Sequence, residues 1–275
     1  MENKKVLFIS QEITPYLPTD EMSSVSRYIP QHIQEMGSKI RTFMPRYGVV
    51  NERRHQLHEV IRLSGMNLII TDMDHPLIIK VASIQAARMQ VYFIDNEDYF
   101  SRKYLFQDEK GKDFRDNDER AVFFARGVLE TVKKLRWAPD IIHCFGWFTS
   151  LVPLYIKKAY YDDPLFMNSK VIFSAYKDSF TSPLRSGFKE KLKIESINNE
   201  DLSVLKTNGF KDLTKLAIHY SDGIIMSQDI ASSDIQKYVK AEGVPFIEHK
   251  EEDFRQAYVD FYNQILNGVT DARSK

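Results

Sequence analysis

One stretch, from Lys5 to Tyr47, constrains the fold more than any other part of this sequence. It begins with a short apolar run, Val6 to Ile9, which is typical of a strand buried on both faces of a parallel sheet. A loop from Ser10 to Ser23 follows, and then a helical segment from Ser24 to Met36. The run from Ile40 to Met44 predicts a second strand. This succession is the repeating unit of a doubly wound α/β domain.

The loop from Ser10 to Ser23 is the expected location of any chemistry. In an open parallel sheet, ligands bind beyond the carboxyl ends of the strands, and most of all beyond the first strand. The residues of this loop therefore carry more weight in a functional interpretation than any other segment of comparable length.

The alternation of strands and helices continues along the chain, with one interruption. Three β-like segments, at 60–63, 67–71 and 77–83, predict an antiparallel excursion inserted into the α/β pattern. A long amphipathic helix is predicted from Asp118 to Trp137. Either Asp116 or Asn117 can act as its N-cap, and Glu119 is placed to complete a capping box from Asp116. Loops are expected at 97–115 and 176–203. Further strands are expected at 90–94, 140–144, 171–175, 223–227 and 245–248, and further helices at 149–160, 210–220 and 230–239.

These patterns predict an α/β fold with a doubly wound, mostly parallel, Rossmann-like sheet flanked by helices. The segment from Glu251 to Leu266 is amphipathic, and we expect it to pack back on the sheet as a C-terminal helix. We expect a single domain, in which residues 1–248 form the main body and residues 249–275 form the C-terminal helix and tail.

Composition excludes several classes of function. Lys plus Arg and Asp plus Glu both number 38, so the chain has no net charge and we expect no nucleic-acid partner. No apolar run is long enough to span a membrane, and the N-terminus does not resemble a signal peptide. The one cysteine, Cys144, precludes an internal disulfide and fits a reducing, cytoplasmic location.

The search for general motifs finds little chemistry. No glycine-rich dinucleotide fingerprint and no P-loop follows any predicted strand. His55 and His58 lack a third and fourth ligand nearby, so we expect neither a metal site nor a cofactor. His143 and Cys144 are adjacent in a predicted strand and should point to opposite faces, which excludes a nucleophile–base pair. His219 is expected to be structural.

Five segments, in order, resemble the N-terminal domain of bacterial glycogen and starch synthases, which belong to glycosyltransferase family 5 and have the GT-B fold. KVLFISQEITP resembles the opening strand and S-E-x-x-P turn of this family, and MPRYG resembles the end of its next strand. DNDERAVFFARGVLE resembles its D-N-x-x-R-F helix, and PDIIHCFGWFTSLVPLYIK resembles its P-D-I-I-H-x-H-D-W-x-T segment. LTKLAIHYSDGIIMSQDIASSDI resembles a later segment of the same domain. The resemblance implies transfer of glucose from ADP-glucose to an α-glucan in a cleft between two Rossmann-like domains. It also implies that the second domain, which holds most of the nucleotide-sugar site, is missing here.

The same resemblance shows that the active-site motifs have changed. Where the family has K-x-G-G-L, this chain has Pro18, Thr19, Asp20, Glu21 and Met22, so two anionic side chains replace glycines that approach the donor phosphates. A phosphate within ~4 Å of one such carboxylate would be repelled by up to about 4 kcal/mol at an effective dielectric of 20.

Two further motifs have lost their polar groups. The family's H-D-W becomes Phe145, Gly146 and Trp147, and its T-I-H-N becomes residues 174–177, with Tyr176 in place of the histidine.

We therefore expect no catalytic residue and interpret the chain as a non-catalytic binding or interaction protein related to glucan metabolism. The alternative is a glucosyltransferase that a partner chain completes. The ligand would be a glucan or a nucleotide sugar, and the cleft face could also hold a second copy or a partner chain. The candidates for the ligand pocket are the positions that match the family's site, namely Thr19, Asp20, Glu21, His143, Trp147, Thr149 and Tyr176. Two of them, Trp147 and Tyr176, could instead fill the core.

Overall fold

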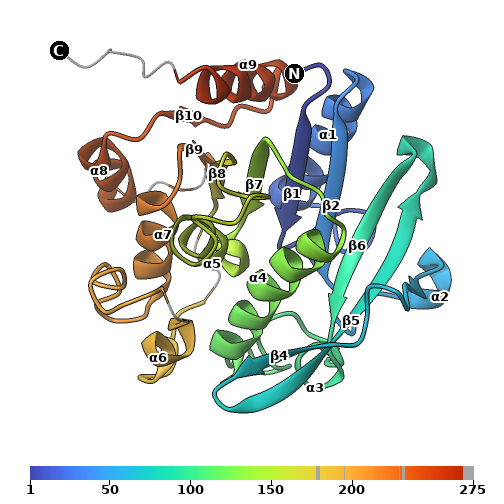
Figure 1. Ribbon diagram of the computed structural model, residues 1–275, viewed down its shortest axis with the longest axis vertical. Helices are drawn as coiled ribbons and strands as arrows, with labels where there is room; N and C mark the ends of the chain where they lie inside the picture. The colour runs from blue at the N-terminus through green and yellow to red at the C-terminus, as the bar shows by residue number, and fades with distance from the viewer. Residues whose placement is uncertain (178–179, 195, 229, 231–232, 269–275) are drawn as a thin grey trace.

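The fold is an α/β sandwich built on one long, mostly parallel sheet (Figure 1). The structure is a computed structural model that describes residues 1–177, 180–194, 196–228, 230 and 233–268. Within these residues the strands lie in the order β10-β9-β8-β7-β1-β2-β6-β5-β3, and β4 pairs with β5. Their bounds are β1 Lys5–Ser10, β2 Lys39–Pro45, β3 His58–Glu59, β4 Met66–Ile70, β5 Met73–Ile84, β6 Met89–Asp95, β7 Ile141–Phe145, β8 Lys170–Ala175, β9 Gly223–Met226 and β10 Phe246–Glu248.

The strands from β10 to β6 are all parallel, which confirms the predicted doubly wound sheet. Strand β5 runs antiparallel to β6, and β3 and β4 both run antiparallel to β5. The predicted antiparallel excursion is therefore present, although one of its strands was wrongly placed. Residues 60–63 form a turn in which the Leu63 amide donates to the Val60 carbonyl at 2.8 Å, and His58–Glu59 makes the strand pairing instead.

Helices cover both faces of the sheet. The main ones are α1 Glu21–Glu35, α4 Asn117–Lys134, α5 Leu151–Leu154, α7 Phe210–His219, α8 Ser233–Glu242 and α9 Phe254–Leu266. The apolar side chains of α4, α5, α7 and α8 join the larger hydrophobic cluster, and in Figure 1 α4 and α5 lie in front of the sheet. Helices α1 and α9 pack against the opposite face in a second, smaller cluster. The predicted C-terminal helix thus packs back on the sheet as expected.

Several predicted boundaries were wrong for local reasons. Helix α1 begins three residues before the predicted Ser24, because Asp20 caps it. Helix α4 ends at Lys134, and Arg136, where the prediction continued the helix, has a left-handed φ of 50°. The carboxylate of Asp116 makes no capping hydrogen bond and instead binds Arg102. The predicted loops contain short helices, α3 Glu97–Phe100 and α6 Phe188–Leu192, and a four-residue helix, α2 Glu52–His55, follows β2.

The predicted helix at 149–160 is divided into a 3-10 turn, Trp147–Thr149, the helix α5 and a π-helix, Tyr155–Ala159. Residues 231–232 of the predicted 230–239 helix and residues 269–275 of the predicted tail lie outside the described residues. Across the described part of the chain, no helix combines the length and apolar character needed to cross a membrane.

Candidate functional site

The loop after β1 ends in a complete capping box at the start of α1. The Ser23 amide donates to the Asp20 carboxylate at 2.7 Å, and the Asp20 amide donates to the Ser23 hydroxyl at 2.9 Å. The first turn also carries Glu21. The neighbouring Thr19 is exposed, and its hydroxyl lies 3.2 Å from that of Thr14.

This cap determines what the start of α1 can bind. The free amide groups and the dipole at a helix N-terminus form a natural position for a phosphate. Here the carboxylate of Asp20 accepts one of those amide hydrogen bonds, so the chain supplies the anion itself. A second anion arriving at this position would face Asp20 and Glu21 together.

The segment after β7 is closed by its neighbours. Phe145 is completely buried, and its ring lies 3.8 Å from the ring of His143, centroid to centroid. Gly146 has a φ of 83°, and a Cβ atom there would lie 2.8 Å from Oε1 of Gln11 and 3.0 Å from Sδ of Met22. No side chain larger than hydrogen fits at residue 146 unless both neighbours move.

Tyr176, which follows β8, belongs to the same buried group. It is only 9% exposed and shares the smaller hydrophobic cluster with Met22, Phe145 and Tyr258 of α9. Burial raises the pKa of Tyr176 well above its ordinary value, and the nearby Tyr258 and Glu21 raise it further. The tyrosine is therefore neutral and forms part of an apolar plug at the carboxyl ends of β1, β7 and β8.

His143 and Thr149 lie beneath the surface. His143 is fully buried, with Nδ1 2.5 Å from the Tyr262 hydroxyl and Nε2 2.7 Å from the Ser174 hydroxyl. Its neighbour Cys144 belongs to the larger cluster on the other face, as the strand alternation predicts. Thr149 is fully buried and donates from Oγ1 to the Gly146 carbonyl at 2.8 Å.

Trp147 packs as a core residue. It is 2% exposed, and its ring centroid lies 4.9 Å from that of Phe106 and 4.8 Å from that of Phe180. Thr19 is exposed and His143 is buried beneath α9, and the other five candidate residues from the sequence fall into two groups. Asp20, Glu21 and Tyr176 come together around the start of α1, whereas Trp147 and Thr149 pack toward the opposite face of the sheet.

An open surface remains at the same edge of the sheet, in segments that the sequence interpretation did not select. Three adjoining pockets of about 510, 240 and 600 Å³ share lining residues, because Phe114 borders the first two and Phe180 and Pro183 border the last two. Together they form one groove, the edge groove, lined by residues of the segments 102–117, 180–185 and 207–211. The only signal for it in the sequence was the density of aromatic and charged residues at 97–115.

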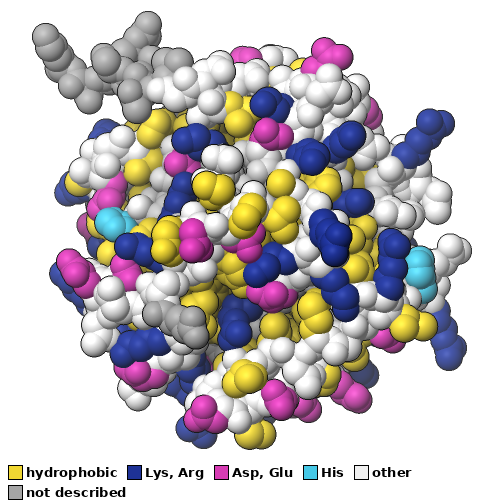
Figure 2. Space-filling view, viewed as in Figure 1, with side chains coloured by type: hydrophobic (Ala, Val, Ile, Leu, Met, Phe, Trp, Pro, Cys, Tyr) yellow, Lys and Arg dark blue, Asp and Glu magenta, His cyan; other side chains and the backbone are white. Residues whose placement is uncertain are grey.

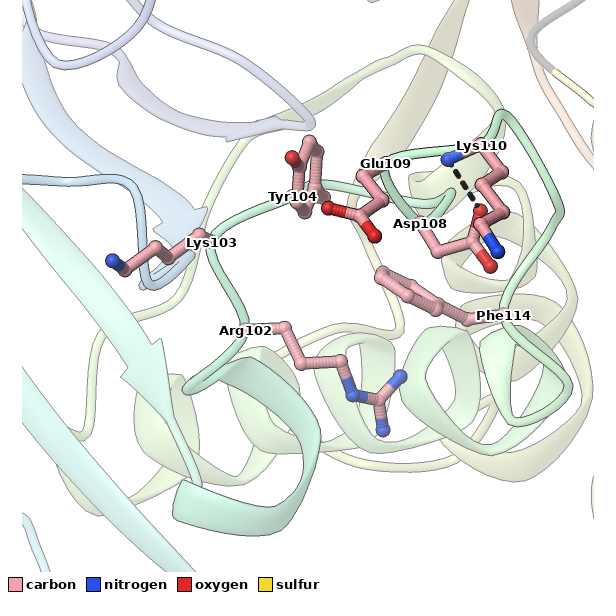
Figure 3. A pocket seen from close by; sticks show the side chains of 7 residues that line it. All are labelled: Arg102, Lys103, Tyr104, Asp108, Glu109, Lys110 and Phe114. Carbon is pink, nitrogen blue, oxygen red and sulfur yellow. Dashed lines mark hydrogen bonds between the residues drawn. The ribbon is translucent and has the colours of Figure 1, made fainter.

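The first of these pockets shows the character of the edge groove (Figure 3). Glu109 and Phe114 converge from opposite sides, whereas Lys103 points away. Tyr104 is 47% exposed at its rim. The Asp108 carboxylate accepts from the Lys110 amide at 2.9 Å and so fixes the turn. Aromatic faces beside carboxylate and ammonium groups suit a polar ligand with apolar faces.

Two arginines, the half-buried Arg102 and the buried Arg120, hold this loop in place. Arg102 forms a two-pronged ion pair with Asp116 and lies 4.5 Å above the ring of Phe114. Burial alone would raise the pKa of Asp116, but hydrogen bonds and the charge of Arg102 hold it below its usual range. Arg120 is fully buried and donates to the Tyr99 carbonyl at 2.8 Å and to Asn117 at 2.6 Å. Burial lowers the pKa of Arg120 to about 10, so it remains charged at neutral pH.

The histidines considered for a metal lie apart from any ligand set. The ring of His55 makes an edge contact with Tyr16 at 5.0 Å, and Nδ1 of His58 lies 3.4 Å from the Gln56 carbonyl. His219 lies 2.8 Å from a Glu242 carboxylate oxygen. Within the residues that the structure describes, no group of three or more His, Cys, Asp or Glu side chains could hold a metal.

Comparison with known proteins identifies consistent relatives. A family model described as the starch synthase catalytic domain matches residues 5–245. A glycogen synthase of Chlorobium luteolum is 39% identical over 175 residues, which are 63% of this chain and 36% of that protein. A glycogen synthase of Chlorobaculum parvum is 34% identical over 224 residues, which are 80% of this chain and 45% of that protein.

Among solved structures, the catalytic domain of starch synthase IV from Arabidopsis thaliana, bound to ADP and acarbose, superposes with a TM-score of 0.69 at 16% identity. The superposition covers 90% of this chain and 51% of the starch synthase IV chain. The chain therefore spans less than half the length of these two glycogen synthases and about half the length of the starch synthase IV structure.

Proposed function

The chain belongs to the family of starch synthase catalytic domains, and from that premise we propose that it is a non-catalytic member that binds an α-glucan. The capping box at Asp20 carries the proposal. It puts a carboxylate where the family resemblance leads us to expect the donor phosphates, and it uses the amide group that would bind them. A pseudoenzyme with this substitution would have little affinity for ADP-glucose.

The packing around Phe145 supports the loss of chemistry. The positions that match the family's catalytic histidine and acid are a fully buried phenylalanine and a glycine held against Gln11 and Met22. Proton transfer and charge stabilisation need polar groups in contact with the substrate. The apolar plug provides none at these two positions.

The edge groove supports retention of a binding function. It combines exposed or half-buried aromatic rings, Tyr104 and Phe114, with the carboxylates of Asp108 and Glu109. Sugar rings present apolar faces and a rim of hydroxyl groups, which such a surface can match. The related starch synthase IV was solved with acarbose, a carbohydrate.

We also propose that residues 1–248 and 249–275 belong to one domain. The described part of the second segment, helix α9, packs into the same cluster as β1, β7 and β8. The single thiol, Cys144, is buried and unpaired, and we propose the reducing cytoplasm as the location.

Three measurements on the full chain test the proposed function. We expect no glucose incorporation into glycogen from ADP-glucose above a buffer control, no calorimetric heat with ADP, and retardation in a native gel that contains glycogen. Incorporation by the chain alone would overturn the non-catalytic assignment. Incorporation that requires both this chain and an added partner chain that is inactive by itself would overturn it in favour of the partner-completed glucosyltransferase.

Substitution of Tyr104 tests the location of the glucan. Tyr104→Ala removes an aromatic contact of about 0.5–1.5 kcal/mol, so we expect glycogen affinity in the gel to fall roughly twofold to tenfold. Tyr161→Ala is the matched control, since Tyr161 is 61% exposed and lines none of the three pockets. Equal loss in both variants, or no retardation of the unaltered chain, would refute binding at this groove.

A further inference from the structure

Two buried histidines lie beneath helix α9, and each meets a tyrosine of that helix. His143 of β7 is fully buried, and its Nδ1 lies 2.5 Å from the Tyr262 hydroxyl. His249, which follows β10, is 4% exposed, and its Nδ1 lies 3.3 Å from the Tyr258 hydroxyl. Both hydrogen bonds link the sheet layer to α9.

The two tyrosines are four residues apart and therefore lie on the same face of α9. Tyr258 is 1% exposed and Tyr262 is completely buried. The rest of that face is apolar, with Val259, Phe261 and Ile265 in the same cluster. Two tyrosine–histidine contacts thus lie within the apolar part of this attachment. At its margin the N-terminal amino group donates to Asn263 at 3.3 Å, and Arg255 lies 5.5 Å from the centre of the Tyr28 ring.

Charge on either histidine would be costly in this position. Burial lowers the pKa of His143 well below its ordinary value. Burial also lowers the pKa of His249, and the charge of Glu251 partly opposes this effect. The other titratable groups that face this region come from α9, from the segment after β8 and from the start of α1: Tyr258, Tyr262, Tyr176, Asp20 and Glu21.

The attachment of α9 is separate from the main core. Its apolar residues belong to the smaller cluster, with α1 and one face of the sheet, whereas α4, α5, α7 and α8 pack in the larger cluster. Separation of α9 from the sheet would expose Phe145 and Tyr176 but would leave the larger cluster intact. Local opening of this kind is the usual way in which a protein exposes one element.

We propose that α9 is a pH-sensitive latch, in which proton uptake by His143 and His249 releases the helix from the sheet and uncovers the plug formed by Phe145 and Tyr176. This inference is independent of whether the chain binds glucan or transfers glucose.

The sign of the pH effect follows from linkage. An accessible histidine titrates near about 6.5, whereas both histidines titrate lower in the docked state. The contribution of the neutral histidines to docking is fully present above about pH 6.5 and is lost as the pH falls below it toward the docked-state pKa values. With two histidines, the equilibrium constant for opening rises by up to about a hundredfold between pH 7.5 and pH 5.5.

Hydrogen exchange followed by mass spectrometry tests the latch in the full chain. Peptides from α9 report the opening, and peptides from α4 in the same sample are the internal reference. Protection factors are first corrected for the pH dependence of the intrinsic exchange rate. Between pH 7.5 and pH 5.5, we expect the protection factor of α9 to decrease by up to about a hundredfold relative to that of α4. Parallel loss of protection in both helices would show global acid unfolding and overturn the proposal.

Histidine variants show which side chains take up the protons that release α9. His249→Gln should reduce the pH effect on α9 to about tenfold, and the double variant with His143→Gln should abolish it. His219→Gln is the control, because His219 is exposed and pairs with Glu242, so the full effect should remain. If the double variant does not fold, His249→Gln alone decides the matter, since an unchanged pH effect in that variant contradicts the latch.

Discussion

Gly146 shows at a single residue how the site has closed. Its φ of 83° strains any L side chain, and an added Cβ would approach Gln11 and Met22 to 3.0 Å or less. We expect Gly146→Ala to lower the free energy of unfolding by about 1–3 kcal/mol in urea titrations. Gly187→Ala is the control. Its φ is −77° and nothing lies within 4 Å of its added Cβ, so a similar loss there would contradict this explanation.

Asp20 contributes to stability as the cap of α1. Asp20→Ala removes the acceptor of the Ser23 amide, and we expect a loss of about 1 kcal/mol in the free energy of unfolding. Asp20→Asn keeps an equivalent acceptor and should stay within a few tenths of a kcal/mol. Chemical denaturation of the two variants side by side measures the difference. Equal stabilities would mean that the cap is of no consequence.

Some residue-level features could be predicted from the sequence and others could not. Strand alternation predicted that His143 and Cys144 point to opposite faces of the sheet. This is confirmed, because Cys144 lies in the larger cluster and His143 contacts Tyr262 in the smaller one. The sequence showed that Asp20 replaces a small residue, but its capping role was missed although Ser23 stands three residues later. Phe145 is buried in a cluster that also holds residues of α9, a segment more than a hundred residues away, and no local pattern reports such an assembly.

At the scale of elements, α6 is joined to the start of α4 by a buried ion pair. Lys191 donates to Asp118 and to Glu119, at 2.6 Å each, and Asp118 is fully buried. Lys191→Ala would leave that carboxylate without its cation, so we expect a loss of about 3 kcal/mol in the free energy of unfolding.

The matched control for this pair lies two residues away. Lys193 pairs with Glu190 on the surface, where the glutamate side chain is 72% exposed. Lys193→Ala should change stability by no more than about 0.5 kcal/mol. Urea unfolding of both variants gives the comparison, and equal effects would count against a special role for the buried pair.

Elements with a clear period were predicted best. Strands buried on both faces and the long α4 stripe were recognised because their patterns come from burial against the whole sheet. Residues 60–63 are apolar enough for a strand, yet Ile61 is 83% exposed, Val60 is only partly buried, and only Leu63 is fully within the core. Helix α6 was missed because five residues are too few to show a period.

For the whole molecule, balanced charge has a measurable consequence. The chain has 38 residues of each sign and a sequence pI near 7.1, and Figure 2 shows both signs interspersed over one face. Because mutual repulsion is weakest at zero net charge, we expect the solubility minimum near pH 7 at low salt. Light scattering across pH 5–9 measures it. A minimum well away from neutrality would contradict this expectation.

The architecture as a whole was predictable, but the edge groove was not. A chain in which strands and helices alternate can adopt only a few layer architectures, and a parallel sheet covered by helices is one of them. The groove is lined by three segments, 102–117, 180–185 and 207–211, that meet only after folding. Its position at the carboxyl edge follows from the fold, whereas its lining depends on loops without a regular period.

The capping box after β1 also affects how the stability of the folded protein depends on its ligands. An enzyme that leaves a helix terminus open for its substrate gains stability when the substrate is present, and its cellular lifetime then follows the supply of that substrate. In this chain an internal carboxylate already occupies the terminus. The stability of the folded protein should therefore not depend on the supply of a phosphate ligand for this terminus.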